Sequence, residues 1–521
     1  MSHIDAEASQ EAVLQVVLQG VTQIPHLVSV HLNETELGKI AFGGQAQGKA
    51  SFFLPTGLIK PGANQVTLTA EAGVSDVSLV DYIRLTYSHS TTADNNRLKL
   101  TAIAEQHITI YGFTSDQIRL VDVTDHAAVQ EITGSISKCD DRFALSVTVP
   151  GGGQSTLLAF TDDQTKRPEA ITANAPSNWR KTNGGADLII IHHGMSAAVA
   201  PLIAARQRQG LSVDVVDVED IFDEFSFGEK SPQAIKAFLV FAETTWKKKP
   251  QYLLIVADAS YDPKNYLGFG DIDLVPTRLI DTNYMEAASD DWFADFDDDG
   301  VPELAVGRLP AKTEQDAAAM ISRLVAYEDS SPANEAVLVA DLNDGFNFED
   351  ANVSLKRLLP ANIKAVEIKR GELGESARPE LIAAINRGQC IVNYTGHGSV
   401  DQWHGSLLTN GDASTLTNQE HLSLFVMMTC LNGYFADPAI DSLAEALMKA
   451  PRGGAIAAWA SSAMTLPNAQ TVVNQELFRQ LFNNRLIRIG MAVRAAKRSI
   501  TDHEVRQTWI LLGDPTMRLK R

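Results

Sequence analysis

The most informative part of this 521-residue chain reads Ile391-Val-Asn-Tyr-Thr-Gly-His397-Gly398 and, further along, Leu424-Phe-Val-Met-Met-Thr-Cys430. Each run is mainly apolar and lacks polar alternation, which is typical of a parallel strand buried on both faces. A reactive side chain, His397 or Cys430, follows each run. Since ligands bind at the carboxyl ends of strands in such sheets, we expect both side chains at the same edge of one sheet.

A histidine and a cysteine at one sheet edge suit nucleophilic catalysis. A thiol becomes a strong nucleophile when its pKa falls or a base removes its proton. An imidazole can take that proton and later deliver it to a leaving amine. The amides of Gly398 and Cys430 are candidates for stabilising an oxyanion. Alone, a His beside Gly is more often a loop residue and a buried Cys is more often filler, so the prediction depends on both residues together.

Around these residues the chain resembles the gingipain family of cysteine peptidases, which belongs with the caspase and legumain enzymes. The resemblance covers about residues 176–521 and implies a caspase-like α/β peptidase domain, a protein or peptide substrate, and a secreted or cell-surface location. The motifs that match, in the family's order, are Gly307-Arg308-Leu309-Pro310, Thr395-Gly-His397-Gly-Ser399 with Trp403, Thr429-Cys430-Leu-Asn-Gly433, and Leu512-Gly513-Asp514-Pro515.

The resemblance also implies roles for further residues. In the family a carboxylate, usually a Glu before Gly, orients the catalytic histidine, and here Asp344 precedes Gly345. Glu349 and Asp350 follow where the family has an acidic residue in its specificity pocket, which would favour Arg over Lys before the cleaved bond. The alternative for this acidic pair is a solvated helix start. Residues expected to contact substrate or line the cleft are Trp403, Ser461 and Ser462.

An acidic loop runs Asp295-Phe-Asp-Asp-Asp-Gly-Val-Pro-Glu303. Its oxygen ligands occupy positions one, three, five and nine, with glycine at six, as in an EF-hand loop for Ca²⁺. Position twelve is Val306 instead of the bidentate Glu, and the alternative is a turn with solvated carboxylates. Members of the gingipain family bind calcium, which favours a structural Ca²⁺ site. Its expected ligands are Asp295, Asp297, Asp299, Val301 and Glu303.

Composition excludes other classes of function. The net charge of −20 argues against nucleic-acid binding, which needs a basic face. No apolar run is long enough to span a membrane. Residues 1–20 lack the basic start and apolar core of a signal peptide, so a cytoplasmic location stays an alternative. Cys139, Cys390 and Cys430 are too few for a disulfide scaffold, and nothing in the sequence predicts an oligomeric state.

The chain is too long for a single core, and its patterning divides it into four parts. Residues 1–90 and 91–175 show short alternating strands, which predict an N-terminal all-β sandwich region ending in a linker. Residues 176–330 and 331–521 alternate strands and helices, which predicts two joined doubly wound parallel-sheet subdomains. Sandwich domains include sugar-binding modules, but without an aromatic platform a structural or docking role is favoured.

The predicted function is a cysteine endopeptidase in which Cys430 attacks the peptide carbonyl, His397 moves the proton and Asp344 orients His397. Two alternatives stay open. A transpeptidase similar to the sortase that processes secreted proteins in gingipain-producing bacteria would use the same dyad with an amine as acceptor. A binding or assembly protein would keep the fold without turnover.

Overall fold

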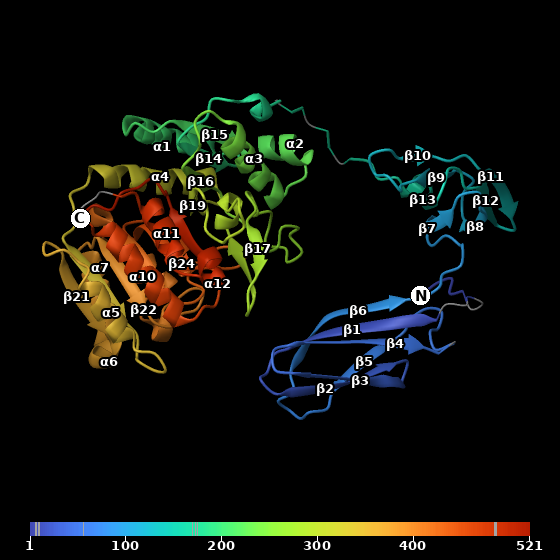
Figure 1. The fold of residues 1–521 in the computed structure, drawn as a ribbon, viewed down its shortest axis with the longest axis horizontal. Coiled ribbons are helices and arrows are strands. Elements are labelled where there is room, and N and C mark those ends of the chain that lie inside the picture. Colours follow the sequence, from blue (N-terminus) through green and yellow to red (C-terminus); the bar gives the residue numbers. More distant parts are fainter. Residues whose placement is uncertain are drawn as a thin grey trace. The chain divides into compact units, whose positions relative to one another are not determined.

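The computed structural model describes residues 1–5, 8, 11–55, 57–168, 170–171, 173–174, 176–483 and 487–521. The chain divides into two compact units, Met1–Ala173 and Asn174–Arg521 (Figure 1). Residues 169, 172 and 175 of the predicted linker lie outside the described residues. Among the helices of the described residues, none is long and apolar enough to cross a membrane.

The first unit begins with two three-stranded sheets, in the orders β4-β1-β6 and β3-β2-β5. Alternate side chains of β1 (Ala12–Gly20) and β2 (Pro25–Leu32) fill the core between them, since successive residues of a strand point to opposite faces. The other strands are β3 (Thr35–Gly43), β4 (Gln47–Leu54), β5 (Val66–Ala70) and β6 (Ser78–Thr86).

A second pair of antiparallel sheets follows, in the orders β10-β9-β13-β7 and β11-β12-β8. Ile110, Leu120 and Leu157 belong to the core that these sheets share. Cys139 is exposed on this part, and its thiol, like that of the buried Cys390, is free. The strands are β7 (Arg97–Ile103), β8 (His107–Phe113), β9 (Ile118–Asp122), β10 (Gln130–Glu131), β11 (Ser135–Cys139), β12 (Arg142–Thr148) and β13 (Gln154–Thr161).

The second unit is built on one ten-stranded sheet, in the order β15-β14-β16-β19-β25-β24-β23-β22-β20-β21. Neighbouring strands are parallel except β24 (Ala455–Ser461) and β25 (Trp509–Gly513). The two predicted α/β subdomains therefore share a mixed sheet, with β25 between them. The other strands are β14 (Leu188–His192), β15 (Val213–Asp217), β16 (Tyr252–Val256), β19 (Ala305–Leu309), β20 (Glu335–Ala340), β21 (Lys364–Lys369), β22 (Ile391–Thr395) and β23 (Ser423–Met428), with a separate hairpin of β17 (Arg278–Asp281) and β18 (Glu286–Ser289).

Helices cover both faces of the large sheet. Ile190 of β14 belongs to a core shared with α1 and α4, whereas Ile191 belongs to a core shared with α2 and α3. Caps begin the helices as predicted: Ser231 accepts from Gln233 N–H at α3, and Thr313 forms a capping box at α4. The helices are α1 (Ser196–Arg208), α2 (Val218–Ser226), α3 (Pro232–Thr245), α4 (Glu314–Asp329), α5 (Phe348–Lys356), α6 (Arg370–Leu373), α7 (Ala377–Asn386), α8 (Asn410–Ala413), α9 (Leu443–Lys449), α10 (Pro467–Leu481), α11 (Ile489–Arg498) and α12 (His503–Thr508).

Two of the motifs quoted above have structural roles. Arg308 of β19 is buried and donates to both carboxylate oxygens of Asp290, at 2.6 and 2.8 Å. Asp514, just past β25, is also buried and accepts from Arg206 of α1 at 2.8 Å. Each buried charge is compensated by a charged partner. These ion pairs lie on β19 and β25, the strands where the two halves of the sheet meet.

Candidate active site

His397 and Cys430 lie just past the ends of two neighbouring strands. β22 and β23 run parallel, with Thr395 opposite Met428. On the other side of β22 is β20, and Asp341 follows its last residue. Because β21 and β22 flank β20, the strand order of this half of the sheet reverses there. The three residues thus lie at the carboxyl edge near a topological switch point, where open α/β sheets bind ligands.

The ring of His397 is oriented by an acid. Its Nε2 donates to Oδ2 of Asp344 at 2.6 Å, and this hydrogen bond lowers the pKa of Asp344. The edge of the ring packs against Phe348, with centroids 5.4 Å apart. Because Nε2 carries the hydrogen that is donated to the carboxylate, Nδ1 has the free lone pair and is the nitrogen that can accept a proton.

The backbone of His397 is held from two sides. Its N–H donates to Oδ2 of Asp341 at 3.2 Å, and its carbonyl accepts from the hydroxyl of Tyr394 at 2.6 Å. Asp341 is buried and also accepts from Arg370 at 2.7 Å and from His404 at 2.9 Å. Although burial opposes its charge, these hydrogen bonds hold the pKa of Asp341 below its ordinary value.

Asp341 is a site residue that the sequence analysis above does not predict. The signal was present, because this carboxylate directly follows an apolar run and so had to lie at the carboxyl edge of a strand. The family resemblance assigns the orienting function to Asp344 alone. The structure shows two acids around His397, with Asp341 on its main chain and Asp344 on its ring.

Cys430 is a partly buried thiol. Its Sγ donates to the carbonyl of Thr465 at 3.6 Å, and burial raises the pKa of the thiol. Among the hydrogen bonds of the described residues, none joins this sulfur to the ring of His397. Cys430 is therefore protonated at rest and needs a base before it can attack a carbonyl.

The loops that carry His397 and Cys430 are nevertheless fastened together. Nδ2 of the buried Asn432 donates to the carbonyl of Ser399 at 2.6 Å. A Cβ atom at Gly398 would come within 2.7 Å of Oγ1 of Thr429, the residue before the cysteine. Glycine at 398 thus permits the close approach of the two loops.

Two backbone amides beside these residues remain available to a ligand. Within the described part of the chain, no hydrogen bond engages the N–H of Gly398 or that of Cys430. The flanking bonds, from Ser399 N–H to Gln402 and from His404 N–H to His397, bypass Gly398. Free amides near a nucleophile are the groups that stabilise an oxyanion.

Three predicted substrate contacts are wrong. Trp403 is fully buried, and its ring stacks on Tyr394 with centroids 4.2 Å apart. Ser461 and Ser462 are also buried, and their hydroxyls donate to the carbonyls of Ala463 and Ala288. These side chains face the interior because the tertiary packing at the strand ends, which local sequence does not reveal, covers them.

The two predicted specificity acids already have partners. Asp350 is exposed at the first turn of α5, where it accepts from Asn347 Nδ2 at 2.7 Å. Glu349 is half-buried and lies 3.5 Å from Nζ of Lys369. Of the two, Glu349 alone combines partial burial with an ion pair.

Two cavities flank the site. One, of about 410 Å³, is lined by Arg370, the partner of Asp341, together with Leu342, Arg378 and Leu407. The other, of about 310 Å³, is lined by Thr465, the partner of Cys430, together with Tyr284 and Leu466. The first cavity thus borders a residue that binds Asp341, and the second borders the residue that binds Cys430.

The acidic loop brings three carboxylates together. Ligand oxygens of Asp295, Asp297 and Glu303 lie within 4.8 Å of one another. Asp299 is outside this group, and its carboxylate accepts from Val301 N–H at 2.7 Å. Burial raises the pKa values of Asp295 and Glu303, and neighbouring carboxylates add to this. A hard cation with oxygen ligands, such as Ca²⁺, fits this donor set because it would offset the repulsion.

Comparison with known proteins identifies relatives of this chain. The model of the family described as "Peptidase family C25" matches residues 181–520. Gingipain R2 from Porphyromonas gingivalis is 23% identical over 401 residues, which cover 70% of this chain and 51% of the relative. Lys-gingipain W83 from the same organism is 23% identical over 288 residues, covering 53% and 15%. The chain spans about half the length, or less, of the curated relatives it matches.

Solved structures agree on the fold. The crystal structure of the Arg-specific cysteine proteinase gingipain R has a TM-score of 0.54 at 21% identity, covering 66% of this chain and 80% of that one. The crystal structure of dimeric latent PorU from Porphyromonas gingivalis has a TM-score of 0.54 at 15% identity. It covers 100% of this chain and 49% of that one.

Proposed function

Because the chain belongs to peptidase family C25, we propose that it is a cysteine endopeptidase whose nucleophile is Cys430 and whose general base is His397. The observation that carries the proposal is the shared sheet edge, where the Asn432–Ser399 hydrogen bond fastens the two loops. The hydrogen bond to Asp344 supports the role of His397, since it leaves Nδ1 as the base.

The proposed reaction begins when Sγ of Cys430 leaves the carbonyl of Thr465 and gives its proton to Nδ1 of His397. The thiolate attacks the peptide carbonyl, and the N–H groups of Gly398 and Cys430 hold the oxyanion. His397 then protonates the leaving amine, which leaves a thioester on Cys430. Water, deprotonated by His397, attacks the thioester, and the acid and the free thiol are released.

The test uses a peptide library and a thiol-directed peptide probe. We expect the native chain to cleave peptides and to form a covalent adduct that disappears in Cys430→Ala and His397→Ala. Cys139→Ala is the matched control, because it removes an exposed free thiol outside the site and should keep the adduct. An adduct that persists in Cys430→Ala would overturn the assignment.

The same assay separates the alternatives. If water is the acceptor, added amines leave the products unchanged. A transpeptidase would instead join the amine to the new carboxyl end. A chain that neither cleaves the library nor reacts with the probe, while its melting transition is intact, would be a binding or assembly protein on this fold.

For residue preference we propose a basic side chain before the cleaved bond, with Glu349 as the acid that binds it. Its support is the partial burial of Glu349 and a Lys369 partner that a substrate cation could displace. Glu349→Gln should then reduce cleavage of Arg and Lys peptides far more than cleavage of neutral ones, and Asp350→Asn is its matched control. Equal losses for all peptides would exclude Glu349 as a specificity residue.

We further propose Ca²⁺ as a structural ion held by Asp295, Asp297 and Glu303, where it would supply positive charge among three carboxylates. The all-β sandwich region of residues 1–175 is proposed to be a structural or docking part. The resemblance to gingipains supports a secreted or cell-surface location, which fractionation of the native organism would test.

A further inference from the structure

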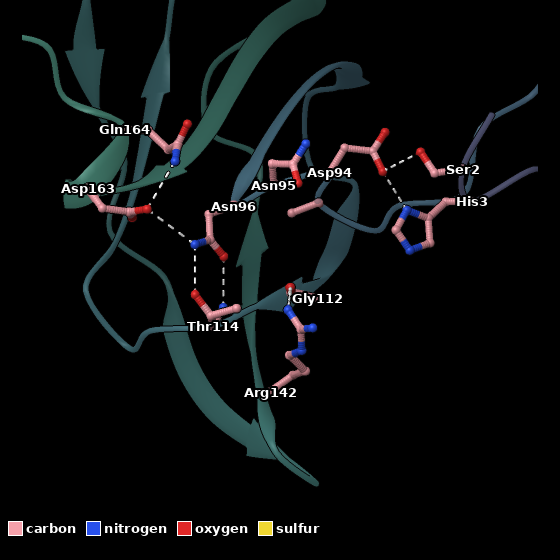
Figure 2. Close-up of a pocket in the computed structure, with 11 residues that line it drawn as sticks. Ser2, His3, Asp94, Asn95, Asn96, Gly112, Thr114, Arg142, Asp163 and Gln164 are labelled. Carbon is pink, nitrogen blue, oxygen red and sulfur yellow. Dashed lines mark hydrogen bonds and ion pairs between the residues drawn. The ribbon is translucent and has the colours of Figure 1, made fainter. Parts of the chain in front are cut away.

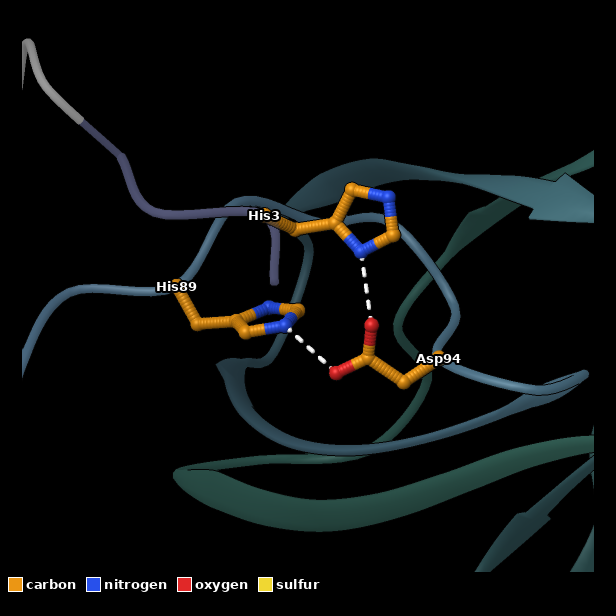
Figure 3. A group of neighbouring side chains, drawn as sticks. All are labelled: His3, His89 and Asp94. Carbon is orange, nitrogen blue, oxygen red and sulfur yellow. Dashed lines mark hydrogen bonds and ion pairs between the residues drawn. The ribbon is translucent and has the colours of Figure 1, made fainter. Parts of the chain in front are cut away.

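A second group of converging side chains lies in the first unit, and Figure 3 shows its members, His3, His89 and Asp94. Nδ1 of His3 is 2.7 Å from Oδ1 of Asp94, and Nε2 of His89 is 2.9 Å from Oδ2. One ligand atom from each residue lies within 4.8 Å of the others. The peptidase mechanism uses none of these residues.

The ring of His89 faces hydrogen-bond acceptors at both nitrogens. Its Nδ1 is 2.6 Å from the carbonyl oxygen of Ser90, and its Nε2 faces the carboxylate of Asp94. Neither oxygen can donate, and a neutral imidazole carries only one N–H. One of the two nitrogens is therefore left without a hydrogen to donate, and a metal ion at Nε2 would resolve this, since Nδ1 would then donate to Ser90.

The surroundings of His89 resemble those of a metal-binding histidine. Such a ligand usually donates its other N–H to a backbone carbonyl or carboxylate, and the carbonyl of Ser90 fills that place. Asp94 is ionised, because hydrogen bonds from Ser2, His3 and His89 outweigh its burial and lower the pKa of Asp94 to about 2. Two imidazoles and a charged carboxylate are therefore directed at one point.

Backbone hydrogen bonds bring His3 and His89 close together. Ile4 and His89 form an isolated antiparallel bridge, and Ser90 N–H donates to the carbonyl of His3 at 2.8 Å. The hydroxyl of Ser2 donates to Oδ1 of Asp94 at 2.7 Å. These contacts hold the start of the chain against the segment between β6 and β7.

An ion could reach this group from solvent. Figure 2 shows a polar cavity of about 930 Å³ whose lining includes Ser2, His3 and Asp94. On the far wall, Asn96 contacts Asp163, and Arg142 donates to the carbonyl of Gly112. An entry path of this kind is one requirement of a metal site.

We propose that His3, His89 and Asp94 bind a Zn²⁺ ion through Nδ1, Nε2 and the carboxylate, with a fourth position open to water. Imidazole with one carboxylate suits Zn²⁺, whereas Ca²⁺ prefers oxygen ligands only. Zinc bonds of about 2.0 Å in a tetrahedron set ligand atoms about 3.3 Å apart. The present separations would have to open by about half an ångström, which partly exposed side chains allow.

The ion would fasten residues 1–5 to the segment before β7. Binding should weaken as the pH falls, because metal ligands must be deprotonated. A site of this composition is distinct from the carboxylate group of the acidic loop. Zn²⁺ should therefore bind to the histidine site, and Ca²⁺ to the acidic loop.

The experiment is a calorimetric titration of the full chain with Zn²⁺ in a Cys430→Ala background, which removes a thiol that also binds zinc. We expect one saturable site that is lost in His89→Ala and in Asp94→Asn. The matched control His126→Ala, an exposed histidine of the same unit, should keep it. Ca²⁺ should not compete for this site.

A second measurement guards against misfolding of the variants. Without metal, His89→Ala and Asp94→Asn should still melt in a single cooperative transition, and the background but neither variant should gain melting temperature on adding Zn²⁺. The proposal is overturned if the background shows no saturable Zn²⁺ binding, or if both variants bind it as the background does. In either case His3, His89 and Asp94 form a hydrogen-bonded group without a metal ion.

Discussion

Nε2 of His397 donates a 2.6 Å hydrogen bond to the carboxylate of Asp344, and this contact joins loops that follow two different strands, β22 and β20. The side chains are 53% and 50% exposed, so water screens the pair in the free protein. A bound peptide that covers them would strengthen the contact, because excluding water strengthens electrostatic interactions.

We therefore predict that Asp344→Asn lowers kcat/KM by about 10²-fold, the lower end of the range for losing an aligned general base. The amide can donate to Nε2 and so favour the wrong tautomer of His397. Asp344→Glu keeps the charge and should retain more activity. Peptide hydrolysis measured against pH checks this, and native kcat/KM in Asp344→Asn would contradict the orienting role.

A second prediction concerns Asn432, which fastens the two loops. Asn432→Ala leaves the partly buried carbonyl of Ser399 without its 2.6 Å donor. The expected cost is about 1–3 kcal/mol of unfolding free energy, together with slower reaction with the thiol probe. Urea unfolding and the labelling rate measure the two effects.

Asn334→Ala is the control for that variant, since Asn334 is exposed. It should change stability by less than about 0.5 kcal/mol. If Asn432→Ala labels at the native rate despite its loss of stability, the hydrogen bond supports the fold and does not position Cys430.

The third prediction is that removing Ca²⁺ destabilises the protein. A chelator should lower the melting temperature, since an ion bound only to the native state at about 100 times its Kd contributes about 2.7 kcal/mol. Glu303→Gln should melt like the chelated chain and no longer respond to Ca²⁺. Asp298→Asn is the control, because Asp298 pairs with Lys236 and is outside the carboxylate group. If the chelator leaves the melting temperature unchanged, the loop is a turn with solvated carboxylates and not a Ca²⁺ site.

The fourth prediction is a pH dependence in the first unit. The buried His26 has Nδ1 2.6 Å from Asp76 and Nε2 2.9 Å from the carbonyl of Gly44, so both nitrogens face acceptors. The hydrogen bond with Asp76 raises the pKa of His26. The stability from a raised pKa is complete below the unfolded value, about 6.5, and is lost as the pH rises through the folded pKa.

The same contact lowers the pKa of Asp76, whose contribution is present above its unfolded value and is lost as the pH falls through its folded pKa. The melting temperature should therefore fall in the native chain as the pH rises above about 6.5, and should fall less in His26→Gln. Parallel curves for the two proteins would show that His26 is not the titrating group.

Much of this architecture was readable from local pattern. The apolar runs before His397 and Cys430 are neighbouring strands, and Ser231 and Thr313 cap helices as expected. The shared sheet was not readable, because the pairing of Arg308 with Leu512 joins residues far apart in the chain. The burial of Trp403 depends on its stacking with Tyr394, which tertiary packing alone creates.

The place of β25 in the sheet has a consequence for biosynthesis. This strand is later in the sequence than every other strand of the sheet, yet it lies between β19 and β24. As the chain leaves the ribosome, both halves can form while each still has an unpaired edge, and such edges invite aggregation. Closing the gap is a late, long-range step, which favours slow folding. Nascent chains stalled before residue 509 should therefore need chaperones, and their dependence should end once β25 has emerged.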